Sequence, residues 1–273
     1  MANWREHSLR ETFCNGETRK RMRDLSRIAS KDKRYSPYLR LPYKITKFLK
    51  YFKIKFDFEK IVEATKAYFL WLKVVDDEID EKNKGLSAIK EEIERSLSGK
   101  KNQTKGLEEL CQNGQTEKSA LIIATENFKK VIKKESFPKM KKELEALYTA
   151  AVLESDSPTM EEYIASRKEI GRQTANCAYS LIKQYCYAPN TLNKKFYEFF
   201  CEIAELGCLV DSAIDIKKDL EKKVLKFSPS FADKMKLYLE TTKKTIKLFQ
   251  KYPGLSKEFL ESVRGVIKNR NVN

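Results

Sequence analysis

The chain has 273 residues, and its 55 lysines and arginines exceed its 39 acidic residues, giving a formal net charge of +16. Hydrophobic residues make up 41% of it, enough for a sizeable core, whereas nine glycines and seven prolines are too few for the many turns of an all-β protein. This composition predicts an all-α fold, a single-domain helical bundle of about ten helices spanning residues 1–273. The positive charge favours anionic partners, although lysines spread along the chain also fit an ordinary lysine-rich surface.

The cysteines and the single histidine exclude several kinds of site. No two cysteines form a C-x-x-C pair, so we expect free thiols in a reducing compartment rather than a disulfide framework or a zinc site. His7 is the only histidine, which excludes a histidine-dependent triad and a histidine-rich metal site. The polar start and the lack of any apolar run near the roughly 18–20 residues that span a bilayer predict a cytoplasmic protein. The cysteines are Cys14, Cys111, Cys177, Cys186, Cys201 and Cys208.

The first half of the chain begins with a basic segment at residues 1–35, which fits either a short amphipathic helix or a mobile arm. The Leu41-Pro42 pair indicates a break. Apolar residues spaced by three and four then predict a helix over residues 56–82, which ends before Gly85. Residues 98–117 are rich in polar residues and glycine, typical of a surface loop or a weak helix.

The second half reads as long helices separated by prolines. We expect helices at residues 118–134 and 138–155, a long helix from Pro158 to about residue 187 with a bend at Gly171, and another over residues 192–223. Pro229 and the Pro253-Gly254 pair separate two final helices. No segment predicts a β-strand.

An aspartate cluster follows the apolar run of residues 67–75. It consists of Asp76, Asp77 and Asp80, and the spacing of four places Asp76 and Asp80 on one helix face. A helix that is apolar nearly all round is buried on most sides, and buried carboxylates need partners or metals. The alternative is a solvated helix end.

A second cluster, also at the end of an apolar helical run, contains Asp211, Asp215 and Asp219 at spacings of four. These side chains share a face. Pairing with nearby lysines such as Lys218 on an ordinary salt-bridged face is the alternative. Two acidic faces at the ends of core helices suit a hard cation such as Mg²⁺, which bridges carboxylates to substrate phosphates.

The two clusters and their surroundings resemble the class I isoprenoid (terpenoid) synthase superfamily. The segment FLWLKVVDDEIDE, residues 69–81, is similar to its aspartate-rich first motif, and LVDSAIDIKKD, residues 209–219, is similar to its second metal motif. The resemblance covers roughly residues 55–225. It implies a helical bundle around a central active-site cavity.

Two branches of that superfamily fit different features. The segment of residues 160–171 is similar to the Y-x-x-x-R segment of terpene cyclases, in which the arginine, here Arg167, senses the diphosphate. Arg172 and Lys218 are further candidates for diphosphate binding. The paired D-x-x-x-D spacing and Lys73 instead resemble squalene and phytoene synthases, which join two prenyl chains head to head.

The resemblance implies a magnesium-dependent lyase of isoprenoid biosynthesis, a terpene synthase that ionises a linear C15 or C20 prenyl diphosphate and gives a cyclic or linear terpene. Asp76, Asp80 and Arg167 would act in ionisation, and the six aspartates would hold three Mg²⁺ ions, with Mn²⁺ as an alternative. The sequence leaves open whether the protein forms a homodimer. A basic helical nucleic-acid-binding protein is the distant alternative. The expected cavity wall consists of Phe69, Leu72, Gly171, Phe200 and Ala204.

Overall fold

A computed structural model describes residues 35–80, 85–97, 116–221, 225–257 and 260–261. In these residues the chain forms eight α-helices packed as a bundle, which confirms the all-α prediction and gives fewer helices than the ten expected. The helices are α2 (Ser36–Tyr51), α3 (Phe58–Asp80), α4 (Leu86–Leu97), α6 (Thr116–Val131), α7 (Phe137–Asp156), α8 (Met160–Lys183), α9 (Asn190–Glu221) and α10 (Phe231–Lys251). Two 3₁₀ turns, Lys134–Ser136 and Pro253–Leu255, flank α7 and α10.

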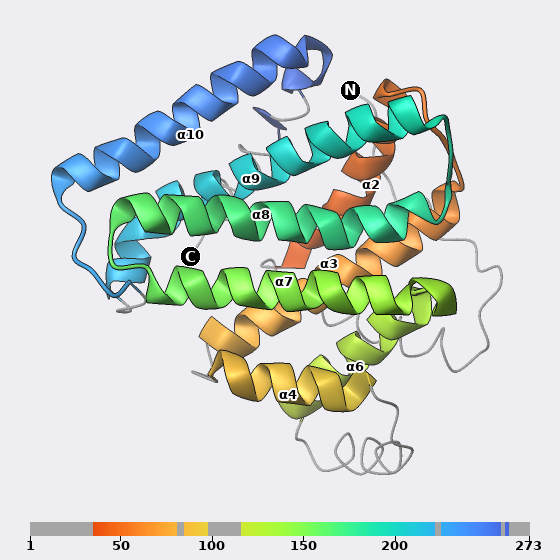
Figure 1. Ribbon diagram of the computed structural model, residues 1–273, viewed down its shortest axis with the longest axis horizontal. Coiled ribbons are helices and arrows are strands. Elements are labelled where there is room, and N and C mark those ends of the chain that lie inside the picture. Colours follow the sequence, from red (N-terminus) through yellow and green to blue (C-terminus); the bar gives the residue numbers. More distant parts are fainter. Residues whose placement is uncertain (1–34, 81–84, 98–115, 222–224, 258–259, 262–273) are drawn as a thin grey trace.

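The long helices form successive layers. Helix α8 packs between α7 and α9, α10 lies on α9, and α2 and α3 pack together behind α7 and α8 (Figure 1). Helices α4 and α6 form the lower end of the bundle, where α6 contacts α3 (Figure 1).

Helix α3 runs through the core because it is apolar on most of its circumference. Tyr68, Phe69, Leu70 and Trp71 are consecutive, and all four are buried. The Trp71 indole stacks on Phe128 of α6 with ring centroids 4.9 Å apart, and its Nε1 donates to the Thr125 hydroxyl at 3.1 Å. A buried indole needs such an acceptor, so this pair fixes how α6 sits against α3.

Gly171 marks the closest approach of α8 and α9. A Cβ at this position would lie 2.6 Å from Glu205 Cα and 2.7 Å from the Ala204 carbonyl oxygen, both on the α9 backbone. A bend was expected at Gly171, and α8 continues through this residue as one unbroken helix from Met160 to Lys183. The glycine therefore serves helix packing.

The break predicted at Leu41-Pro42 is wrong, since α2 continues through Pro42. Proline lacks the N–H that would bond the carbonyl of Tyr38 and costs about 3 kcal/mol inside a helix. Ile45, Phe48 and Leu49 are buried later in the same helix, and α2 packs on α3. This burial offsets the loss at Pro42.

Two short strands also depart from the prediction. Helix α8 ends at Lys183 rather than near residue 187, and the strand β2 (Cys186–Tyr187) pairs antiparallel with β1 (Lys55–Phe56). The pairing lets the turn after α8 satisfy backbone groups against the turn before α3. Segments of two residues carry no periodicity that a sequence could reveal.

Several expectations fall on residues outside the described part. These are the basic segment of residues 1–34, the loop of residues 98–115, His7, Cys14, Cys111 and most of the last predicted helix. Among the described cysteines, Cys177, Cys186, Cys201 and Cys208 are free thiols, as predicted. Within the described ranges, no helix has both the length and the apolar composition needed to cross a bilayer.

Candidate functional site

The first acidic motif lies on the last turns of α3. Asp76 is about half exposed, whereas Asp77 is mostly buried, and both carboxylates bind the ammonium of Lys73. The distances from Lys73 Nζ are 2.8 Å to Asp76 Oδ2 and 2.6 Å to Asp77 Oδ1. Burial alone would lower the pKa of Lys73, but Asp76 and Asp77 outweigh it and raise that pKa above its ordinary value. The side chain of Asp80 lies outside the described residues.

Helix α2 begins directly beside this motif. The Tyr35 hydroxyl, one residue before α2, donates to Asp77 Oδ2 at 2.8 Å. Tyr38, in the first turn of α2, has its ring centroid 5.9 Å from Lys73 Nζ, a cation–π distance. Tyr35, just before α2, and Tyr38, in its first turn, therefore border the acids of α3.

The second acidic motif lies on α9, near its C-terminal end. Asp211 is about half exposed, Asp215 is partly buried, and Ser212 between them is buried. The Tyr163 hydroxyl of α8 donates to Ser212 Oγ at 3.2 Å, which fixes this turn of α9 against α8. The side chains of Lys218 and Asp219 lie outside the described residues.

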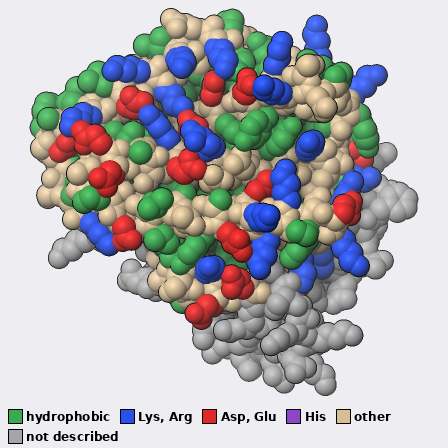
Figure 2. Space-filling model, viewed as in Figure 1, with side chains coloured by type: hydrophobic (Ala, Val, Ile, Leu, Met, Phe, Trp, Pro, Cys, Tyr) green, Lys and Arg blue, Asp and Glu red, His purple; other side chains and the backbone are tan. Residues whose placement is uncertain are grey.

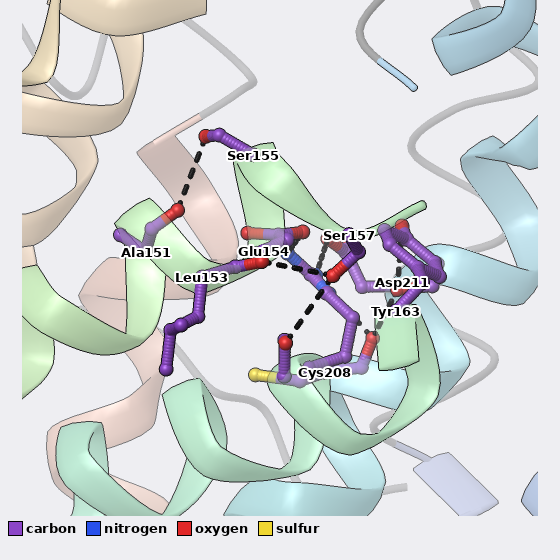
Figure 3. Close-up of polar contacts among 11 residues, drawn as sticks. Ala151, Leu153, Glu154, Ser155, Ser157, Tyr163, Cys208 and Asp211 are labelled. Carbon is purple, nitrogen blue, oxygen red and sulfur yellow. Dashed lines mark hydrogen bonds and ion pairs between the residues drawn. The ribbon is translucent and has the colours of Figure 1, made fainter. Parts of the chain in front are cut away.

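Arg167 of α8 joins this motif to α7. Its guanidinium donates from Nη1 to Glu154 Oε1 at 3.0 Å, and from Nη2 to Asp211 Oδ2 at 3.2 Å and to the Cys208 carbonyl at 3.3 Å. Figure 3 shows Glu154, Cys208 and Asp211 around this point, with Tyr163 alongside. The buried Nε has no hydrogen-bond partner in the described part of the chain. The Nε donor of Arg167 is thus not used, while the carboxylates of Glu154 and Asp211 bind its two Nη groups.

Acids from both motifs affect the pKa of Tyr38. Burial is the main reason that its pKa is raised above the ordinary tyrosine value, and the negative charges of Asp76 and Asp211 raise it further. Asp76 acts on this pKa from α3 and Asp211 from α9. Lys73 lowers the same pKa and partly offsets them.

The donors of the two motifs fit Mg²⁺ in kind, since carboxylate oxygens are its preferred protein ligands. Among the described side chains, however, no three acidic, cysteine or histidine residues are grouped closely enough to hold a metal ion. Asp76 and Asp77 are compensated by Lys73, and Asp211 by Arg167. A protein cation therefore contacts part of each motif.

The remaining predicted residues have other neighbours. Arg172 donates to Glu205 on α9 and to Glu169 on its own helix, each at 3.0 Å. Phe69 and Phe200 are buried in the core, where Phe200 stacks on Phe196, and Leu72 and Ala204 pack against that core. A diphosphate contact for Arg172 and a cavity lined by these apolar residues stay predictions.

Three residues of the site were not foreseen from the sequence: Tyr35, Tyr38 and Glu154. All three reach the site from other helices, across 42 residues from Tyr35 to Asp77 and 13 from Glu154 to Arg167. The only sequence signal for the tyrosines was their position shortly before Pro42. Their residue type alone does not tell a site residue from one that packs in the core. The prediction of a break at Pro42 also concealed the helix that carries them.

Comparisons with protein-family models, curated proteins and solved structures find no match for this chain.

Proposed function

We propose that the protein is a magnesium-dependent class I terpene synthase that acts on a linear prenyl diphosphate of 15 or 20 carbons. The observation that carries this proposal is the contact of Arg167 with Asp211 on α9, together with the pair of acids Asp76 and Asp77 on α3. Two acidic motifs on helices of one bundle, with a guanidinium bound to one of them, suit a substrate that carries two phosphates.

In the proposed reaction, the bond between the allylic carbon and the diphosphate oxygen breaks, and its electron pair leaves with the diphosphate. Mg²⁺ held by Asp76, Asp77 and Asp80 on one helix and by Asp211, Asp215 and Asp219 on the other would neutralise the charge that grows on the leaving group. Arg167 would donate to phosphate oxygens from the Nη2 group that borders Asp211. The carbocation would then transfer a proton to the released diphosphate and give a terpene.

The chain's own residues have the remaining roles. Glu154 accepts from Nη1 of Arg167 and Asp211 from Nη2, which would orient the guanidinium before substrate arrives. The partly buried Tyr38 ring, which already lies near one cation, would face the developing positive charge on the substrate. Lys73 must release Asp76 and Asp77 when metal binds, and it would then remain near the diphosphate as a further cation.

The test is incubation of the purified full chain with C10, C15 and C20 prenyl diphosphates and Mg²⁺, measuring released diphosphate and the hydrocarbon products. Asp76→Asn and Asp215→Asn should each reduce turnover by about 100-fold or more, because a charge-stabilising contact is lost. Asp156→Asn is the matched control, since Asp156 is an exposed aspartate on α7 whose partner is Lys226. Equal melting temperatures would show that the variants remain folded.

A second readout does not depend on knowing the substrate. Mg²⁺ and inorganic diphosphate added together should raise the melting temperature, whereas either alone should not, because the site binds them as a unit. No diphosphate release from any of the three substrates, or full activity in both aspartate variants, would refute the proposal. A hydrocarbon with twice the carbon number of the substrate would instead identify head-to-head condensation, the activity of squalene and phytoene synthases.

A further inference from the structure

Helix α10 carries large apolar side chains on two sides. Leu237 and Leu248 point into the protein and are buried against α9 and its neighbours. A second set is exposed on the opposite side, including Phe231 at 80%, Leu239 at 53% and Ile246 at 52%. We call this set the outer strip of α10; it consists of Phe231, Met235, Tyr238, Leu239 and Ile246.

The spacing makes the outer strip continuous. Phe231, Met235 and Tyr238 follow one another at four and three residues, and Ile246 lies two turns further on the same side. Isolated exposed apolar residues are common, but five on one face of one helix form a patch of the kind that marks an interaction surface.

Lysines border the outer strip along one edge. Lys236, Lys243 and Lys247 are exposed and recur at seven and four residues, which places them in one row. Hydrophobic and basic side chains are interspersed over α10 on the surface shown in Figure 2. The whole helix contains six lysines and only two acidic residues, Asp233 and Glu240.

A shallow groove continues this surface toward α8. It has a volume of about 360 Å³, and Ile164 and Leu239 provide its apolar lining. Lys168 binds Glu240 at 2.5 Å across the groove, and Lys236 binds Glu161. These ion pairs link α10 to α8 beside the outer strip, while α10 packs mainly on α9.

The chemistry of the outer strip selects among possible partners. A nucleic acid would pair with the lysines but offers no apolar counterpart for Phe231, Leu239 and Ile246. A second copy of the chain would bring its own lysine row, and like charges repel. The undescribed segments 1–34 and 262–273 are themselves basic by sequence, so they lack charge complementarity as well.

An anionic lipid surface matches both halves of the pattern. The acyl boundary accepts apolar side chains to a depth of about 5–10 Å, and anionic headgroups attract lysines beside them. Tyr238 suits the boundary, because its ring is apolar and its hydroxyl is polar. No helix in the described ranges could cross the bilayer, so the contact would lie in the plane of the interface.

We propose that the outer strip of α10 and its lysine row dock the protein onto an anionic membrane surface. This docking is independent of the proposed enzymatic function, because the strip shares no residue with the acidic motifs. It would hold the helical bundle against the lipid bilayer, in which long apolar molecules dissolve.

The experiment is co-sedimentation of the full chain with vesicles of phosphatidylcholine alone and with vesicles in which roughly a third of the lipid is phosphatidylserine. The protein should bind the anionic vesicles, bind the neutral ones weakly, and dissociate as salt is added. The double variant Leu239→Ser/Ile246→Ser should reduce binding about tenfold, because apolar area no longer enters the interface. Lys243→Glu/Lys247→Glu should reduce it by at least as much.

Matched controls separate this site from general stickiness. Leu153→Ser changes a leucine of α7 that is 56% exposed, and Lys142→Glu changes an exposed lysine of the same helix, so neither should alter binding. Binding that the two α10 variants leave intact would overturn the proposal. So would loss of binding with the lysine variant alone, which indicates charge without insertion, or a dimer that the apolar variant dissociates in the absence of vesicles.

Discussion

Arg167 connects three helices through one guanidinium. Its side chain is 17% exposed, and it binds Glu154 of α7, Asp211 of α9 and the carbonyl of Cys208. Removal of one partner of a buried ion pair is costly, because the other charge stays behind without compensation. The same geometry therefore gives Arg167 a role in stability that can be measured separately from any role in substrate binding.

We predict that Arg167→Met lowers the free energy of unfolding by about 3 kcal/mol, measured by urea denaturation, because Glu154 is left partly buried without its cation. Arg172→Met is the control on the same helix. Arg172 is 50% exposed, so its ion pairs are screened and its loss should cost about 1 kcal/mol or less.

A double-mutant cycle assigns the cost to the pair. Glu154→Gln in the Arg167→Met background should be much less destabilising than in the wild type, because no unpaired carboxylate remains. Additive effects of the two substitutions would show that the Glu154–Arg167 contact does not contribute.

At the crossing of α8 and α9, the two backbones approach too closely for an added side chain. Gly171 lies against the backbone of α9, and Arg167 is one turn before it on α8. Any separation of the two helices at Gly171 therefore also moves Arg167 away from Asp211. The second glycine of the pair of helices, Gly207 on α9, has no atom within 4 Å of a Cβ placed on it.

We therefore predict that alanine at these two positions changes the free energy of unfolding in opposite directions. Gly171→Ala should lower the free energy of unfolding by about 1–3 kcal/mol, since the new methyl group would contact backbone that cannot turn aside. Gly207→Ala should raise it by up to about 1 kcal/mol, because alanine favours the helix and meets nothing. Thermal unfolding of both variants provides the measurement, and a stabilised Gly171→Ala would contradict the crossing geometry described here.

The sequence predicted most long helices because their apolar spacing is regular. Helix α3 was expected at residues 56–82 and spans Phe58–Asp80, and α9 was expected at 192–223 and spans Asn190–Glu221. Helix α2 was missed because the local cost of Pro42 is visible in the sequence, whereas the burial that offsets it depends on α3. Helix α4 was not assigned, and it packs mainly on α6, far along the chain.

The candidate residues on single helices were found for the same reason. Asp76, Asp211 and Arg167 belong to local patterns, whereas the ion pair between Arg167 and Asp211 is a finding of the structure. Tyr38 and Glu154 have no such pattern, because their place follows from how α2 and α7 pack. Whether a cavity lies beside them stays a prediction.

At the scale of the whole molecule, the interior contains protonated thiols and phenols that would become anions at high pH. Burial raises the pKa of Cys177 and of Cys186 to about 12 and that of Cys208 to about 11. Tyr68, whose hydroxyl donates to the Thr174 carbonyl, is fully buried and also has a raised pKa. The folded state therefore holds protons that the unfolded state releases once the pH exceeds about 9.

We predict that stability falls steeply with alkalinity. A raised folded-state pKa stabilises the fold fully below the unfolded value, and that contribution is lost as the pH rises between the two values. Each such thiol should contribute a slope of up to about 1.4 kcal/mol per pH unit. Urea unfolding of wild type and Cys177→Ala, with reductant, at pH of about 8 and about 10.5 would test this. The variant should lose less stability across that interval, and equal losses would contradict the prediction.

Lys73 has a consequence for how the proposed enzyme would take up its metal. Because its ammonium already binds Asp76 and Asp77, the arrival of a divalent ion is an exchange of one cation for another. The apparent affinity for the metal ion would therefore depend on how much more strongly Asp76 and Asp77 bind the ion than they bind Lys73. The lysine would compete with the metal for the same carboxylates. In the proposed enzyme, Lys73 would offset the repulsion between Asp76 and Asp77 and would lower the apparent affinity for the metal ion.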